Sequence, residues 1–106
     1  MMIARWRIDA RFGHKQQVID SLKQWMNEVG SQIGWTPGKV RLLTGSVGAR
    51  ESTVVSEIQV ESMAELDASF AKLATIEAHK EWGRKLEPYI VSGSPRWEVF
   101  RVLDGT

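Results

Sequence analysis

The chain has 106 residues, 42% of them hydrophobic, and its 14 Lys and Arg against 13 Asp and Glu give a formal net charge of +1. This length predicts a single domain over residues 1–106, and the near-neutral charge argues against a protein whose main ligand is a nucleic-acid backbone. The chain has no cysteine, which excludes disulfides, thiolate metal ligands and a cysteine nucleophile. The N-terminal residues lack the apolar stretch of a signal peptide, and no apolar run is long enough to span a bilayer. We therefore expect a cytoplasmic protein that does not contact membranes.

The first half of the chain changes from a strand pattern to a helix pattern. Residues Met2–Phe12 alternate between apolar even positions and mostly charged odd positions, which predicts a strand with one apolar face. After Gly13, apolar residues recur from Val18 to Val29 at the spacing of an amphipathic helix. Gly30 or Gly34 offers a stop for this helix.

The second half begins with two β-branched runs, Lys39–Val47 and Thr53–Val60, which we expect to form a hairpin. Ser62 and Glu65 have the spacing of a capping box, so a second helix is predicted to start there. Its helical pattern resumes or kinks around Thr75 and ends before Pro88. The last predicted strand covers Arg96–Leu103.

This element order, β-α-β-β-α-β, predicts an α+β protein with the ferredoxin-like plait, in which two helices cover one face of a four-stranded antiparallel sheet. The opposite, open face would carry charged residues of the first strand and part of the third. If Phe100 and Val102 face the helices, three other residues of the last strand join the open face. The predicted open face then includes Arg5, Arg7, Asp9, Val55, Glu57, Trp97, Val99 and Arg101.

In element order and size the chain resembles the dimeric α/β-barrel superfamily, which includes antibiotic-biosynthesis monooxygenases, NIPSNAP-type domains and small heme-degrading monooxygenases. The sharpest local likeness is Ala78-His79-Lys80 in the second helical region. The resemblance implies a homodimer in which two open faces enclose a lumen. In heme-degrading members a histidine at this place ligates iron, and it works with an asparagine on the first strand and a tryptophan about ten residues before the histidine. Here those stretches read Ala4-Arg5-Trp6-Arg7 and Ser69-Phe70, so we expect no heme and no other cofactor.

The candidate site centres on His79, which shares one side of its helix with Trp82 and Gly83. A helical glycine costs about 1 kcal/mol relative to alanine, so Gly83 indicates space left for a ligand. We expect His79 to point into a pocket and to be catalytic, because a pKa of about 6.5 lets an imidazole accept and return a proton at neutral pH. The alternative is a structural histidine. No ligand spacing joins His79 to His14, so no metal site is predicted.

Arg5, Arg7 and Arg101 form the second candidate site, because we expect them to cluster on adjacent strands. Clustered guanidiniums favour a carboxylate, phenolate or enolate ligand. The alternative is cross-strand pairing of these arginines with Asp9 and Glu57. The residues predicted to bind substrate are Arg5, Arg7, Glu57, Trp82, Trp97 and Arg101.

Three functional classes follow. The first is a cofactor-independent, monooxygenase-like enzyme that acts on a small anionic or aromatic substrate in the barrel lumen. The second is a non-catalytic homodimeric barrel that binds a metabolite or serves a structural role. The third is an RNA-recognition-type domain, which needs aromatic residues on its first and third strands, and Val54–Val60 has none. The expected partners are a second copy of the chain and a small molecule, without nucleic acid.

Overall fold

The computed structural model describes residues 1–103. None of the helices in this range is long and apolar enough to cross a membrane. Within these residues, four strands, three α-helices and two short 3-10 helices follow one another. In order they are β1 (Met2–Asp9), α1 (Lys15–Glu28), η1 (Gly30–Ile33), β2 (Val40–Thr44), β3 (Thr53–Val60), α2 (Met63–Leu73), α3 (Glu77–Leu86), η2 (Glu87–Tyr89) and β4 (Arg96–Arg101).

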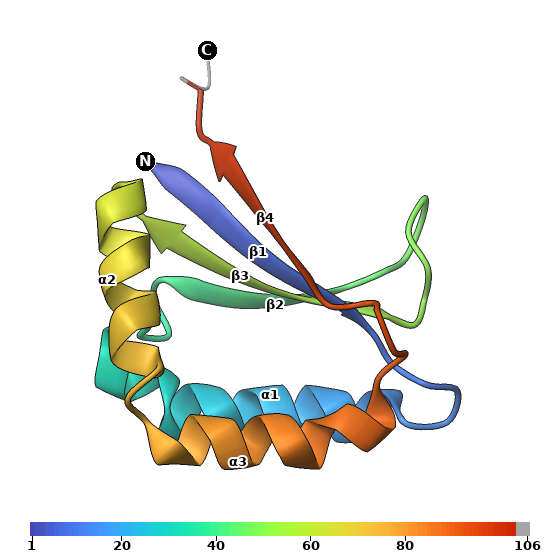
Figure 1. Ribbon diagram of the computed structural model, residues 1–106. Coiled ribbons are helices and arrows are strands. Elements are labelled where there is room, and N and C mark those ends of the chain that lie inside the picture. Colours follow the sequence, from blue (N-terminus) through green and yellow to red (C-terminus); the bar gives the residue numbers. More distant parts are fainter. Residues whose placement is uncertain (104–106) are drawn as a thin grey trace.

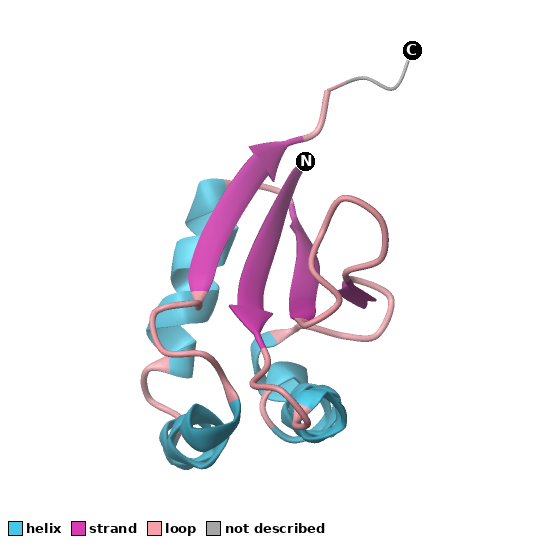
Figure 2. Ribbon diagram, turned by 90° about the vertical axis from the view of Figure 1, so that its right-hand side faces the viewer, coloured by secondary structure: helices cyan, strands magenta, loops and turns pink. Residues whose placement is uncertain are grey.

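The strands form one antiparallel sheet in the order β2-β3-β1-β4. All three α-helices lie on one side of this sheet, with α1 and α3 side by side beneath it and α2 near the end where β1 begins (Figure 1). In the view turned by 90°, α1 and α3 are seen nearly end-on below the strands, and α2 lies behind the strands (Figure 2). This arrangement confirms the predicted α+β ferredoxin-like fold, and within residues 1–103 no helix covers the other face.

The helix-facing side of the sheet holds two hydrophobic clusters. One gathers Ala4, Trp25 and Ile58, and the other gathers Ile8, Leu22 and Val54. Between them runs a row of directly paired residues across all four strands, which reads Leu42, Ser56, Trp6 and Trp97. Because a serine stands where the flanking helix-facing positions of β3 carry a valine and an isoleucine, the core is thinner at this row.

The break in the second helical region is confirmed, since α2 ends at Leu73 and α3 begins at Glu77. The Ser62 hydroxyl caps α2 by accepting from the amide of Glu65, 3.2 Å away. In a capping box the Glu65 carboxylate would accept from the amide of Ser62. Here it accepts from the amide of the preceding residue, Glu61.

Three predicted strands are too long at their C-terminal ends, and the last of them, β4, ends at Arg101 rather than at Leu103. β1 ends at Asp9, and Phe12, predicted on the apolar face, is fully exposed. The chain turns there because Gly13 has a φ of +82°. β2 ends at Thr44. The next residue, Gly45, lies so close to the carbonyl of Arg50 that a Cβ would stand 1.7 Å from that oxygen, so a residue with a side chain does not fit there.

The predicted facing of the last strand is wrong. Trp97 pairs with Trp6 and Val99 pairs with Ala4, and directly paired residues share a face of the sheet. Trp97, Val99 and Arg101 therefore face the helix side, whereas Phe100 shares the open face with its partner Ile3. Both alternating sets of β4 contain apolar residues, so its facing is decided by the register with β1.

Candidate functional site

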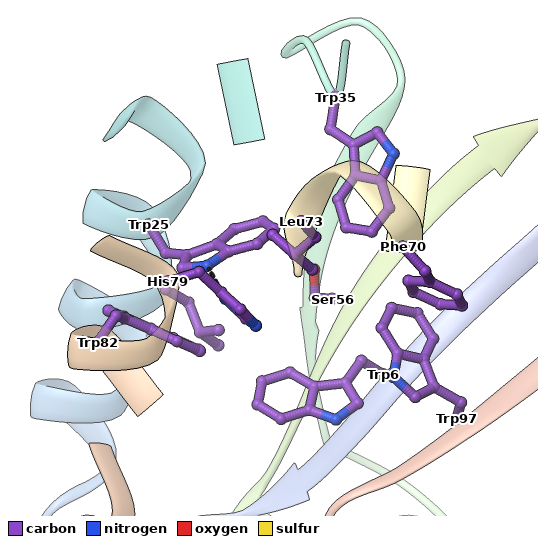
Figure 3. A pocket seen from close by; sticks show the side chains of 10 residues that line it. Trp6, Trp25, Trp35, Ser56, Phe70, Leu73, His79, Trp82 and Trp97 are labelled. Atoms are coloured by element: carbon purple, nitrogen blue, oxygen red, sulfur yellow. Dashed lines mark hydrogen bonds between the residues drawn. The ribbon is translucent and has the colours of Figure 1, made fainter. Parts of the chain in front are cut away.

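A cavity of about 330 Å³ lies between the helix-facing side of the sheet and the helices, and we call it the aromatic pocket. All five tryptophans of the chain line it. Figure 3 shows their side chains directed around a common space. The lining residues are Trp6, Leu22, Trp25, Trp35, Ser56, Phe70, Leu73, His79, Trp82 and Trp97.

The wall of the pocket is a network of tilted aromatic rings. Trp25 and Trp35 are buried at its base, with ring centroids 5.6 Å apart, while Trp97 is 42% exposed at its rim. Trp6 joins the two sides, because its ring lies 6.0 Å from that of Trp82 and 6.4 Å from that of Trp97. Such tilted pairs are a favoured aromatic geometry, so the rings support one another while enclosing the space next to Ser56.

His79 is held in the pocket by two tryptophans. Its Nδ1 lies 3.0 Å from Nε1 of Trp25 on α1, and its ring stacks on Trp82 of the same helix at a centroid distance of 6.1 Å. Trp82 in turn donates to the carbonyl of Ser21, 3.0 Å away, which ties α3 to α1. Burial lowers the pKa of His79 below its ordinary value, because the apolar surroundings disfavour the charged imidazolium.

The open face of the sheet carries a layer of paired charges. Glu57 is only 2% exposed and lies between Arg41, at 2.7 Å, and Nε of Arg5, at 3.3 Å. Arg7 pairs with Glu98 at 3.1 Å. This layer matches the alternative of cross-strand pairing, although Asp9 takes no part in these ion pairs and instead accepts from the Thr53 hydroxyl at 2.6 Å.

The structure divides the predicted site residues between the two faces. His79, Trp82 and Trp97 line the aromatic pocket, which lies on the helix side of the sheet and not against its open face. Arg5, Arg7 and Glu57 lie on the open face, and Arg101, paired with Met2, is separated from both arginines by the sheet. The prediction that three arginines share one cavity is therefore wrong.

Several pocket residues were not predicted as site residues. Trp6, Trp25 and Trp35 are not among the residues predicted to bind substrate, but all three line the cavity. The available signal was the number of tryptophans, five in 106 residues. Ser56, Phe70, Leu22 and Leu73 carried no comparable signal.

Within the described chain, no group of three or more His, Asp or Glu side chains gathers in a way that could hold a metal ion. Among the lining side chains, His79 is the common metal ligand by type. Its Nδ1 faces an indole N–H, which can only donate, so that nitrogen supplies its lone pair to Trp25.

The fold and the pocket define a small ferredoxin-like α+β domain with an aromatic cavity. Solved structures of the same fold include a NIPSNAP family protein from Agrobacterium tumefaciens, 18% identical with a TM-score of 0.77, covering 100% of this chain and 97% of that chain. A NIPSNAP domain protein from Burkholderia xenovorans is 16% identical, with a TM-score of 0.70 over 100% of this chain and 98% of that chain. A candidate antibiotic biosynthesis monooxygenase from Caulobacter crescentus is 15% identical, with a TM-score of 0.68 over 97% of this chain and 90% of that chain.

At these identities the likeness establishes the fold, and it confirms the resemblance predicted from the sequence at that level. The chain matches no protein-family model and no curated protein.

Proposed function

We propose that this protein binds a small, neutral aromatic molecule in the aromatic pocket. The observation that carries the proposal is the convergence of all five tryptophans on one cavity of about 330 Å³. Small-molecule sites are typically cavities of about 300–1,000 Å³ with apolar and aromatic walls and a few polar groups. Here Ser56 and His79 supply the polar groups.

The pocket favours a neutral ligand because its lining contains no arginine, lysine or carboxylate. Burying an anion there would cost its hydration without a compensating ion pair. Two of the arginines expected to hold an anionic substrate, Arg5 and Arg7, lie across the sheet and pair with Glu57 and Glu98, and the third, Arg101, does not line the pocket.

A fluorescence titration tests the binding function directly, since the tryptophans are the natural reporters. Naphthalene should quench the emission saturably. Ser56→Leu fills the thin row of the core and should abolish this quenching, whereas Gln59→Leu, an exposed change on the opposite face of the same strand, should leave it intact. Equal quenching in both variants would contradict the proposal.

We further propose that two copies of the chain pair through their open faces. Ile3 and Phe100 lie on this face, with Phe100 46% exposed, beside charges that are already paired within the protomer, so association would bury apolar surface without leaving a charge unpaired. Light scattering should give twice the 12.0 kDa mass of the chain, and Phe100→Asp should shift the mass toward 12.0 kDa. A wild-type mass of 12.0 kDa at high concentration would contradict the dimer.

A second candidate function is cofactor-independent, monooxygenase-like oxidation of the bound molecule. It is supported by the fold shared with candidate antibiotic biosynthesis monooxygenases. Oxygen uptake with 1-naphthol should then depend on the protein and disappear in Ser56→Leu. Saturable binding without oxygen uptake would favour the non-catalytic alternative.

A further inference from the structure

The hydrogen bond between Trp25 and His79 determines which ring nitrogen of the histidine carries the proton. An indole N–H has no acceptor capacity, so Nδ1 of His79 must accept across the 3.0 Å that separates it from Nε1 of Trp25. In a neutral imidazole the second nitrogen, Nε2, then carries the hydrogen. Figure 3 shows this second nitrogen directed away from Trp25 and into the pocket.

Nothing charged in the pocket favours the imidazolium form. All five charged residues of α3 are exposed. Four of them pair with one another, Lys80 with Glu77 at 3.8 Å and Arg84 with Glu81 at 3.2 Å. Protonating Nδ1 would set two donors head to head at hydrogen-bond distance. The elements packed around the ring present only uncharged pocket side chains, which are Trp25 and Leu22 from α1, Trp82 from α3, Phe70 and Leu73 from α2, and Trp6, Ser56 and Trp97 from the sheet.

We propose that His79 is a fixed hydrogen-bond donor, and that the pocket selects planar, neutral aromatic molecules whose carbonyl oxygen or ring nitrogen accepts from its Nε2–H. This inference rests on the proposed binding function and names the class of ligand. Trp25 is a positioning residue, because it acts on the ligand only through the tautomer of His79. The tryptophan rings would stack on the plane of the aromatic ligand, and the hydrogen bond from Nε2–H of His79 would fix the ligand's orientation within that plane.

The same geometry disagrees with the catalytic role predicted for His79 and with iron ligation, the role that a histidine at this place has in heme-degrading members of the superfamily. A general base needs a free lone pair toward the substrate, and iron ligation through Nε2 needs that nitrogen unprotonated. Either role would require the proton on Nδ1, which faces the N–H of Trp25. The pocket therefore does not fit a heme whose iron is held by His79.

Nitrogen-15 NMR of the histidine-labelled protein reads the tautomer without any ligand. His14 is the only other histidine, and a spectrum of His79→Phe assigns the two ring systems. We expect Nδ1 of His79 to have a pyridine-type shift and Nε2 a pyrrole-type shift at pH 7. In Trp25→Phe, which keeps a ring and removes the N–H, both tautomers should appear. A pyridine-type Nε2 in the wild type, or an unchanged tautomer in Trp25→Phe, would overturn the inference.

Matched probes test the ligand class. Quinoline and naphthalene share size and shape, but quinoline carries one ring-nitrogen acceptor. The ratio of quinoline to naphthalene affinity should fall about two- to tenfold in His79→Phe, the equivalent of one net hydrogen bond. An unchanged ratio would overturn the donor role while leaving the binding function standing. If neither probe binds the wild type, the binding function and the ligand class fall together, whereas the NMR result on His79 stands by itself.

Discussion

The two faces of the sheet are built from alternate residues of the same strands, yet they carry opposite chemistry. On the helix side, Trp6 and Ser56 border an uncharged aromatic pocket. On the open side, their strand neighbours Arg5 and Glu57 belong to a layer of ion pairs. A displacement of one residue along a strand thus separates a ligand site from a candidate protein interface. Because the sheet keeps the charges away from the pocket, the tryptophans and His79 remain in apolar surroundings.

The largest expected effect comes from the base of the pocket. Trp25→Ala removes a buried ring that contacts Trp35, Trp82 and His79, and it should lower the free energy of unfolding by about 3–5 kcal/mol. Phe12→Ala removes a fully exposed ring and should change it by less than about 0.5 kcal/mol. Urea denaturation measures both, and a mild effect of Trp25→Ala would mean that its ring contributes little to the packing.

On the open face, Glu57→Ala removes the carboxylate that Arg5 and Arg41 share. The expected loss is about 1.5–3 kcal/mol, the range for hydrogen bonds to charged groups, since the partly exposed arginines can be hydrated. Glu57→Gln keeps the shape and should lose less. Neither variant should alter naphthalene binding at a fixed protein concentration. Weaker binding in both would show that the two faces are coupled.

The sequence predicted the fold better than it predicted the site, for a physical reason. Alternation along β1 and β3 identified the strands and their faces, because one face of each is apolar and the other mostly polar. In β4 the apolar residues occupy both alternating sets, Trp97 and Val99 in one and Phe100 in the other, so only pairing with β1 assigns its faces. The residues that line the pocket are even harder to predict from the sequence. Trp25 and His79 meet across 54 residues, a contact that no local spacing encodes.

Acidification should lower the free energy of unfolding through the titration of His79. In the unfolded chain this histidine titrates near its ordinary value of 6.5, whereas burial lowers its pKa in the folded protein. As the pH falls below about 6.5, the unfolded state takes up a proton that the folded state does not, so the free energy of unfolding decreases. Carboxylates also titrate in acid, so the quantity to measure is the wild-type stability minus that of His79→Phe. This difference should shrink between about pH 7 and pH 5, and a rising difference would contradict the lowered pKa.

The smallest expected effect on stability is that of a substitution at Gly83, and Gly30, which has closer neighbours, serves as its control. The sequence indicated that Gly83 leaves space beside His79, but Gly83 does not line the pocket, and a Cβ there would meet nothing within 4 Å. Gly83→Ala should therefore stabilise α3 by about 0.5–1 kcal/mol and leave naphthalene affinity unchanged. Gly30 is the matched control, because a Cβ there would stand 3.3 Å from the ring of Trp25. Gly30→Ala should shift that ring, lower the stability and weaken binding. If Gly83→Ala instead weakened binding, the pocket would have to extend along α3 past His79, and the glycine would regain the role that its position in the sequence first indicated.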